Sequence, residues 1–181
     1  MRRSKLISQK FFNRAAEKVA RELLGKFLCR QQLGNRVPKC LMITEVEAYD
    51  GFKDKASHAH RGKTTRNFPM FGPAGRWYVY FTYGMHWMLN IVTGPQNYPA
   101  AVLIRGVENI NGPGRITKFL KINKRFNAKK ADKKTGLWIA APSGRASPRK
   151  YGAGKFKIKR ASRVGVDYAG KWAKKLLRFT F

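Results

Sequence analysis

The sequence has few acidic residues, two cysteines and no long apolar run. Nine Asp plus Glu stand against 39 Lys plus Arg in 181 residues, a formal net charge of +30. Cys29 and Cys40 are too few for a disulfide framework; they could pair, but we expect two reduced thiols in an intracellular protein. No run approaches the roughly 18 apolar residues of a membrane span, and the N-terminus shows no signal peptide. We therefore expect no membrane association.

The charge indicates a polyanionic partner. A strongly positive surface concentrates polyanions by long-range attraction, and nucleic acid is the usual partner because phosphates neutralise such a surface. The same charge could instead reflect solubility or a basic bias of a whole proteome. An anionic membrane is a weaker rival, because the chain has no long amphipathic basic helix.

Apolar spacing outlines the secondary structure. A helix is predicted within residues 11–27, ended by Gly25, and a second helix begins near Gly112. Residues 26–49 read as strand, turn and strand, with the bend at Gly34-Asn35. Further strands are predicted at residues 100–108, 137–140 and 163–181; residues 50–75 and the basic residues 143–161 are predicted loops.

Residues 76–93 form the clearest element, a β-hairpin. Two β-rich runs flank Gly84-Met85, which suits a type II′ turn, and one strand places Tyr78, Tyr80 and Thr82 on the same face. Short connections between strands predict a largely antiparallel sheet. The predicted fold class is α+β: a single mixed domain over residues 1–181, with a protruding hairpin.

The scarce carboxylates gather in ITEVEAYDGF, residues 43–52, with Asp54 just beyond. In a strand, Glu45, Glu47 and Tyr49 share one face, and either glutamate could be a base that activates water. Alternatively, both are surface acids paired with the abundant Lys and Arg. Apolar flanks place at least one near the edge of the core, where a carboxylate needs a partner or a function.

Aromatic side chains near these acids could stack on nucleic-acid bases, and a tyrosine at a hairpin tip could wedge into a base step. Alternatively, strands simply favour Tyr and Trp. The histidines at 58, 60 and 86 lack zinc-site spacing, so we expect no metal, and the motif of a zinc deaminase is absent. The turn before Gly114 reads as a plain helix entry rather than a phosphate loop.

Five blocks in order give a family resemblance: EVEAY, TTRNFPMF, YVYFTYGMHWMLN, VLIRGVE and RVGVDYAGKWAKKLLRF. Together they resemble the alkyladenine (3-methyladenine) DNA glycosylase family of the mammalian type. The resemblance implies one domain around an antiparallel sheet, with a hairpin that enters the DNA minor groove. It also implies hydrolytic excision of flipped alkylated purines, such as 3-methyladenine, from double-stranded DNA, which starts base excision repair.

The resemblance assigns the catalytic groups to three positions. Glu47 matches the carboxylate that activates the hydrolytic water, and Arg105 and the backbone of Val164 match groups that help to hold this water. Glu45 is expected to be structural. The family implies a monofunctional enzyme that needs no cofactor or metal.

The resemblance also assigns groups that contact the base and the DNA. Tyr49, His58 and Tyr80 match the walls of the pocket that stacks the extruded base. Asn90 matches a residue at the pocket floor that disfavours the guanine amino group, and Tyr83 matches the side chain that fills the gap in the duplex. We expect a monomer located with DNA, in a bacterial cytoplasm or nucleoid or in a nucleus. The alternatives are a non-catalytic architectural DNA- or RNA-binding protein and a basic ribosome-associated protein.

Overall fold

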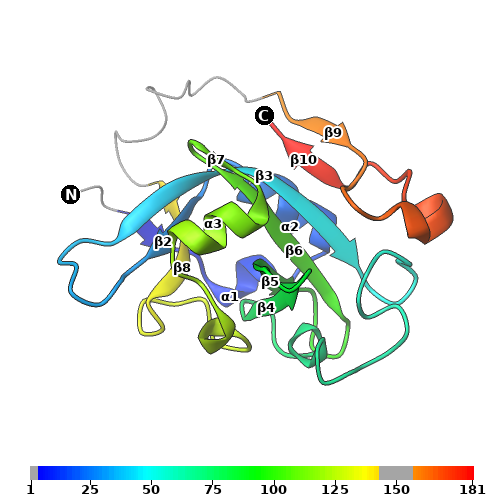
Figure 1. Cartoon of the computed structure of the whole chain (residues 1–181), viewed down its shortest axis with the longest axis horizontal. Coiled ribbons are helices and arrows are strands. Elements are labelled where there is room, and N and C mark those ends of the chain that lie inside the picture. The colour runs from blue at the N-terminus through cyan, green and yellow to red at the C-terminus, as the bar shows by residue number, and fades with distance from the viewer. Residues whose placement is uncertain (1–3, 143–156) are drawn as a thin grey trace.

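A ten-stranded sheet forms the framework of the computed structural model, which describes residues 4–142 and 157–181 (Figure 1). The main path runs β1-β8-β2-β3-β6-β5-β4, while β10 pairs with β3 and β9, and β7 pairs with β6. All of these pairings are antiparallel within the described ranges. The predicted α+β class with a largely antiparallel sheet is therefore confirmed.

The strands are β1 (Ser4–Leu6), β2 (Phe27–Arg30), β3 (Lys39–Asp50), β4 (Trp77–Thr82), β5 (His86–Thr93), β6 (Ala100–Val107), β7 (Ile110–Asn111), β8 (Leu137–Pro142), β9 (Lys159–Ala161) and β10 (Arg178–Thr180). The helices are α1 (Gln9–Phe12), α2 (Ala16–Leu23), α3 (Pro113–Phe119) and the 3₁₀ segments η1 (Phe68–Phe71), η2 (Lys124–Phe126) and η5 (Asp167–Trp172).

Helix α2 covers part of the core. Its buried residues, Ala16, Val19, Ala20 and Leu23, repeat at the i, i+3, i+4, i+7 spacing of one helix face. The single helix predicted over residues 11–27 is wrong in one respect, because α1 and α2 are separate helices. The chain turns between them, where the Arg14 backbone N–H donates to the Phe12 carbonyl.

Strand β3 is the longest strand and pairs with β2, β6 and β10. Around Glu47 it has neighbours on both edges, since Glu47 lies opposite Leu103 of β6 and Arg178 of β10. The carboxylate-bearing end of β3 is therefore fixed within the sheet rather than at a free edge.

The predicted hairpin is formed by β4 and β5, and its turn differs from the prediction. The Met85 N–H donates to the Thr82 carbonyl (3.2 Å), so the two central residues are Tyr83 and Gly84. Their φ angles are 52° and 65°, and positive φ at both positions is the pattern of a type I′ turn. The predicted type II′ turn at Gly84-Met85 is therefore wrong by one residue.

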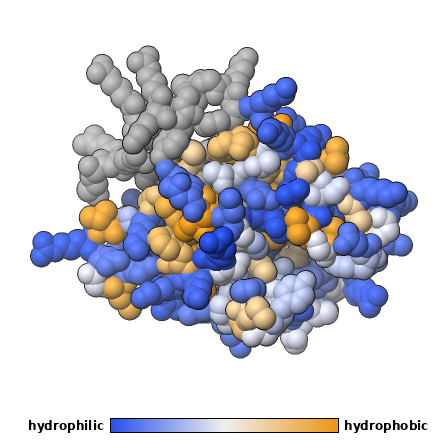
Figure 2. All heavy atoms as spheres, turned by 45° about the horizontal axis from the view of Figure 1, so that its top comes forward, coloured by the Kyte–Doolittle hydropathy of each residue, from blue (hydrophilic) through white to orange (hydrophobic). Residues whose placement is uncertain are grey.

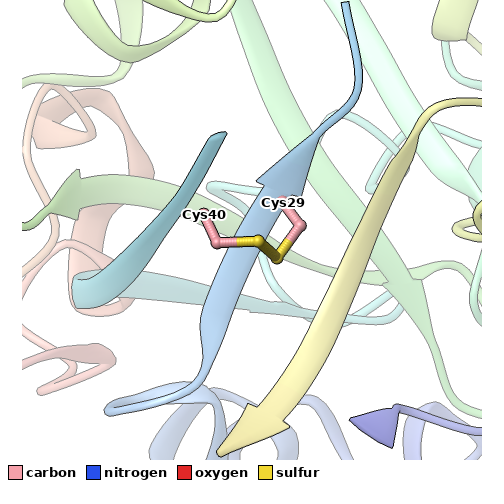
Figure 3. The surroundings of a disulfide bond; sticks show 2 residues. All are labelled: Cys29 and Cys40. Carbon is pink, nitrogen blue, oxygen red and sulfur yellow. A yellow bond between two sulfur atoms is a disulfide. The ribbon is translucent and has the colours of Figure 1, made fainter. Parts of the chain in front are cut away.

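Cys29 and Cys40 form a disulfide bond, so the expectation of two reduced thiols is wrong (Figure 3). The reason lies in the strand register: Cys29 of β2 lies directly opposite Cys40 of β3, with 4.0 Å between the Cα atoms. Directly opposed residues of an antiparallel pair bring their side chains within bonding reach.

The C-terminal segment is mostly not extended. Of the strand predicted over residues 163–181, only β10 forms, because the chain turns through Gly165 and Gly170 at positive φ around η5. Of the predicted loop at 143–161, residues 143–156 lie outside the described residues and 159–161 form β9. In the described ranges, no helix has the length and apolar character to cross a membrane.

Candidate active site

A pocket of about 250 Å³ opens beside the end of β3. This is slightly below the volume range of drug-sized ligand sites. All eight residues assigned from the sequence line it: Glu47, Tyr49, His58, Tyr80, Tyr83, Asn90, Arg105 and Val164. They come from β3, the 50–75 loop, the hairpin, β6 and the C-terminal segment, so the fold gathers residues that are far apart in the chain.

Glu47 is completely buried at this pocket. Its Oε2 accepts a hydrogen bond from the Tyr49 hydroxyl (2.9 Å), and its Oε1 accepts one from the Val164 backbone N–H (2.8 Å). Arg105 Nε lies 3.4 Å from the same Oε1. Burial raises the pKa of the Glu47 carboxyl, and these three partners oppose the rise. The site thus holds a carboxylate that is more basic than usual and already fixed in orientation.

Glu45 occupies a different position from Glu47. It does not line the pocket. Its Oε1 lies 3.2 Å from Arg105 Nε and 3.2 Å from an Nη1 of Arg178. Glu45 and Glu47 therefore share Arg105, and only Glu47 faces the cavity.

Aromatic rings form the walls of the pocket. The His58 and Tyr80 ring centroids are 4.6 Å apart, those of Tyr78 and Tyr80 are 5.1 Å apart, and His58 Nδ1 lies 2.9 Å from the Tyr78 hydroxyl. Burial, followed by the charge of Arg66, lowers the pKa of His58 to about 4. Burial raises the pKa of Tyr80 to about 12. Both rings are therefore uncharged at pH 7.

Two of the lining residues, Asn90 and Tyr83, differ in exposure. Asn90 is buried, and its Nδ2 donates to the Tyr78 carbonyl (3.1 Å), which fixes the side-chain amide. Tyr83 lies at the hairpin tip with 78% of its surface exposed. Its backbone φ of 52° belongs to the hairpin turn.

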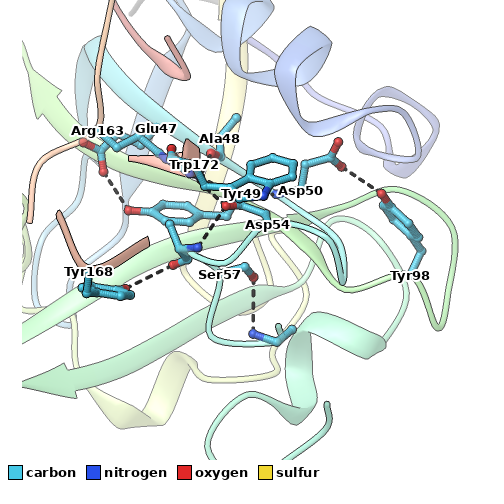
Figure 4. Close-up of polar contacts among 12 residues, drawn as sticks. Glu47, Ala48, Tyr49, Asp50, Asp54, Ser57, Tyr98, Arg163, Tyr168 and Trp172 are labelled. Atoms are coloured by element: carbon cyan, nitrogen blue, oxygen red, sulfur yellow. Dashed lines mark hydrogen bonds and ion pairs between the residues drawn. The ribbon is translucent and has the colours of Figure 1, made fainter. Parts of the chain in front are cut away.

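A buried ion pair beneath the pocket was not predicted from the sequence (Figure 4). Arg163 donates from both terminal nitrogens to Asp54, at 2.5 and 2.8 Å, and both side chains are fully buried. Arg163 also donates to the carbonyl of Ala48 (2.8 Å), and its guanidinium lies 4.7 Å from the centre of the Tyr49 ring. It therefore contacts the strand segment that carries both Glu47 and Tyr49.

Asp54 ties the neighbouring loop to the same pair. Its carboxylate accepts from the backbone N–H groups of Asp50 (3.2 Å) and Ala56 (3.1 Å). The only signal in the sequence was that Asp54 belongs to the group of scarce acids.

Tyr168, at the mouth of the pocket, was also missed. It is 71% exposed on η5, and its hydroxyl lies 3.4 Å from the Ala56 carbonyl (Figure 4). Across residues 4–142 and 157–181, no group of three or more His, Cys, Asp or Glu side chains has an arrangement suited to a metal ion.

Comparison with known proteins finds similar chains. The chain is 40% identical over 177 residues to a protein of Legionella pneumophila (strain Lens), which covers 93% of this chain and 90% of the relative. It is 39% identical over 180 residues to a protein of Anaeromyxobacter dehalogenans (96% and 82%), and 38% identical over 194 residues to one of Methanocella arvoryzae (96% and 91%). All three are named as candidate 3-methyladenine DNA glycosylases.

A family model described as methylpurine-DNA glycosylase matches residues 10–181, which include every pocket residue described above. The chain therefore belongs to the methylpurine-DNA glycosylase family.

Proposed function

We propose that this chain is a monofunctional DNA glycosylase that flips alkylated purines, such as 3-methyladenine, out of duplex DNA and hydrolyses their glycosidic bond. The observation that carries the proposal is the fully buried Glu47 at the base of an aromatic pocket. A base inside a duplex is out of reach of such a carboxylate, so the nucleotide must leave the stack. The product is an abasic site, which starts base excision repair.

The substrate class follows from the pocket walls. Alkylation at a ring nitrogen makes a purine cationic, and aromatic faces attract cations. In this proposal the rings of Tyr49, His58 and Tyr80, which line the pocket, stack on such a base, and His58 carries no competing charge at pH 7. In this proposal Asn90, whose amide is held by its hydrogen bond to the Tyr78 carbonyl, disfavours a purine with an extra amino group.

The reaction balances with Glu47 as the base. The bond between the sugar C1′ and the purine nitrogen breaks, and its electron pair neutralises the cationic purine, which leaves. The sugar carbon becomes electron-poor and is stabilised by the Glu47 anion. A water oxygen bonds to C1′ and Glu47 accepts the water proton, while Arg105 and the Val164 backbone hold the carboxylate and this water. No other acid or cofactor is required for a cationic leaving group.

The Arg163–Asp54 pair acts as a positioning device in this scheme. Val164 directly follows Arg163, so fixing Arg163 also fixes the backbone N–H that bonds to Glu47. The same guanidinium holds the Ala48 carbonyl between Glu47 and Tyr49. Through Asp54 it also orders the loop that leads to His58.

DNA binding rests on charge and on the hairpin. The net charge is +30, and hydrophilic side chains cover most of the face shown in Figure 2, with separate hydrophobic patches between them. We propose that the hairpin enters the minor groove and that Tyr83 fills the space left by the flipped nucleotide. In this proposal the enzyme acts as a monomer and is located in the cell compartment that contains its DNA substrate.

The experiment is a panel of duplexes, each with one modified purine, incubated with the purified protein and then treated with alkali. A monofunctional glycosylase leaves the strand intact until alkali cleaves the abasic site. Strand cleavage without alkali would indicate a lyase instead. A protein that binds every duplex and releases no base would be a non-catalytic nucleic-acid binder, and the proposal would be wrong.

A further inference from the structure

A second hollow lies at the opposite end of β3 from Glu47. It is lined by the end of β2, the loop that follows it, η2 and the segment after η2: Arg30, Gln31, Gln32, Leu33, Gly34, Asn35, Arg125, Phe126, Lys129, Lys133, Lys134, Thr135 and Gly136. Arg30 pairs with Lys39, eight residues before Glu47. At about 3.3 Å per residue, the two sites are up to roughly 26 Å apart along the strand. Figure 1 shows the β2–β3 loop far from β10.

The hollow is strongly basic. Five of its 13 lining residues are Lys or Arg, and none is Asp or Glu. The nearby Asp132 does not line it and accepts from the Thr135 backbone N–H (2.9 Å). The lining of the hollow therefore concentrates cationic side chains without an acidic residue to balance them, in a molecule whose formal net charge is already +30.

Arg30 distinguishes this hollow from an ordinary lysine-rich surface. The residue is only 4% exposed, and its Nη1 donates to two carbonyls, of Gln31 and, at 3.0 Å, of Gly136. In the described part of the chain, no carboxylate lies within ion-pair distance of Arg30, and its buried Nε has no hydrogen-bond partner. A buried cation without an anion is costly, so this group is prepared for an anionic ligand.

A second guanidinium increases this cost. Arg30 and Arg125 both lie over the ring of Phe126, with 4.7 Å and 5.0 Å from each guanidinium carbon to the ring centre. Burial, followed by the charge of Arg125, lowers the pKa of Arg30. Two like charges close to one ring repel each other, and a bound anion would relieve the repulsion.

We propose that this hollow is a second anion site that binds phosphate groups of a nucleic-acid backbone. Guanidinium groups match phosphate oxygens in geometry, and Lys129, Lys133 and Lys134 extend the positive surface from the buried arginine. The site lies at the far end of β3 from Glu47 and beside the base of the hairpin, where the Trp77 N–H donates to the Lys129 carbonyl (2.8 Å). It can therefore hold backbone phosphates that are remote from the flipped nucleotide. The inference does not depend on the chemistry at Glu47.

The test compares two triple variants of the full chain with equal charge. One is K129Q/K133Q/K134Q in the hollow, and the control is K5Q/K10Q/K18Q, whose lysines are exposed and outside the hollow. Binding to an undamaged duplex is measured over a range of salt concentrations. Each phosphate contact contributes about 0.9 to the slope of log affinity against log salt. The magnitude of the slope should therefore decrease by up to about 3 in the hollow variant and by less than about 1 in the control.

Single-turnover excision at saturating enzyme should be unchanged in the hollow variant. The proposed anion site can therefore be refuted without refuting the proposed catalytic role of Glu47, and the reverse also holds. Equal loss of slope in both variants would show that the lysines act only through net charge, and would overturn the proposal.

A second measurement identifies the ligand on the folded wild-type protein. The NMR signal of the Arg30 Nε–H should shift on addition of undamaged duplex, at a lower phosphate concentration than with inorganic phosphate. A shift with inorganic phosphate alone would assign the site to the free ion and overturn the nucleic-acid assignment. No shift with either probe would overturn the site itself.

Discussion

Replacing Tyr49 by phenylalanine removes one hydroxyl from the pocket and keeps the ring that stacks on the base. This hydroxyl donates to Glu47 Oε2 at 2.9 Å, and the bond favours the carboxylate over the carboxylic acid. Burial already raises the pKa of Glu47. Loss of the hydroxyl raises it further, so the protonated, inactive form persists to higher pH.

The size of the effect follows from the kind of bond. A hydrogen bond to a charged group contributes about 1.5–3 kcal/mol, and about 1.4 kcal/mol is a factor of ten in an equilibrium. On the acid limb of the pH profile, most of Glu47 is protonated. There the ionised fraction of Glu47, and with it the excision rate, should be roughly 10- to 100-fold lower in Tyr49→Phe than in the wild type. The loss should shrink as the pH rises.

The assay is single-turnover excision of a cationic alkylated purine over a pH series that runs from neutral pH down through the acid limb of the profile. Tyr98→Phe is the matched control, because its hydroxyl also meets a carboxylate, Asp50 Oδ1 at 3.3 Å, but lies outside the pocket. An acid limb of Tyr49→Phe that superimposes on that of the wild type would refute the reasoning, since ionisation of Glu47 would then not control the rate.

Three further perturbations address the support of the site. Asp54→Asn leaves Arg163 buried without a counter-charge, so the free energy of unfolding, measured in urea, should fall by about 3–5 kcal/mol; a change below about 1 kcal/mol would contradict the assigned pairing. Tyr83→Ala should weaken binding to a duplex with a stable abasic analogue about tenfold or more, and unchanged affinity would remove its role in filling the gap. The double variant C29S/C40S removes a cross-link between residues 11 positions apart in the sequence and should lower the free energy of unfolding by about 2–3 kcal/mol. Excision by the folded protein should stay unchanged.

The parts of the fold that the sequence predicts are those encoded by local pattern. The hairpin strands and β3 are six to twelve residues long, and their apolar residues either alternate with polar ones or follow one another. Few secondary structures other than a strand fit such a pattern. The helix over residues 11–27 was predicted with the right face, yet the break between α1 and α2 depends on backbone contacts, such as the Gly94 N–H donating to Phe12. The hairpin turn was misplaced because an exposed tyrosine at positive φ is rare.

The parts that the sequence does not predict depend on contacts between distant segments. Arg163 and Asp54 are 109 residues apart, and neither stands in a pattern that indicates the other. The Cys29–Cys40 bond depends on the register of β2 against β3. A shift of one residue in this register would move the two cysteines apart and prevent the bond. The apolar flanks drew attention to Glu45 and Glu47 together, and only the family resemblance singled out Glu47.

Glu47→Gln tests the central claim most directly, because it keeps the size of the side chain and removes its negative charge and its capacity to accept a proton. Glu45→Gln is the control, since Glu45 shares Arg105 but does not line the pocket. On a duplex with one alkylated adenine, we predict that Glu47→Gln binds with near wild-type affinity and releases base at least roughly 100-fold more slowly, while Glu45→Gln retains most of the rate. Base release by Glu47→Gln at the wild-type rate would contradict the account.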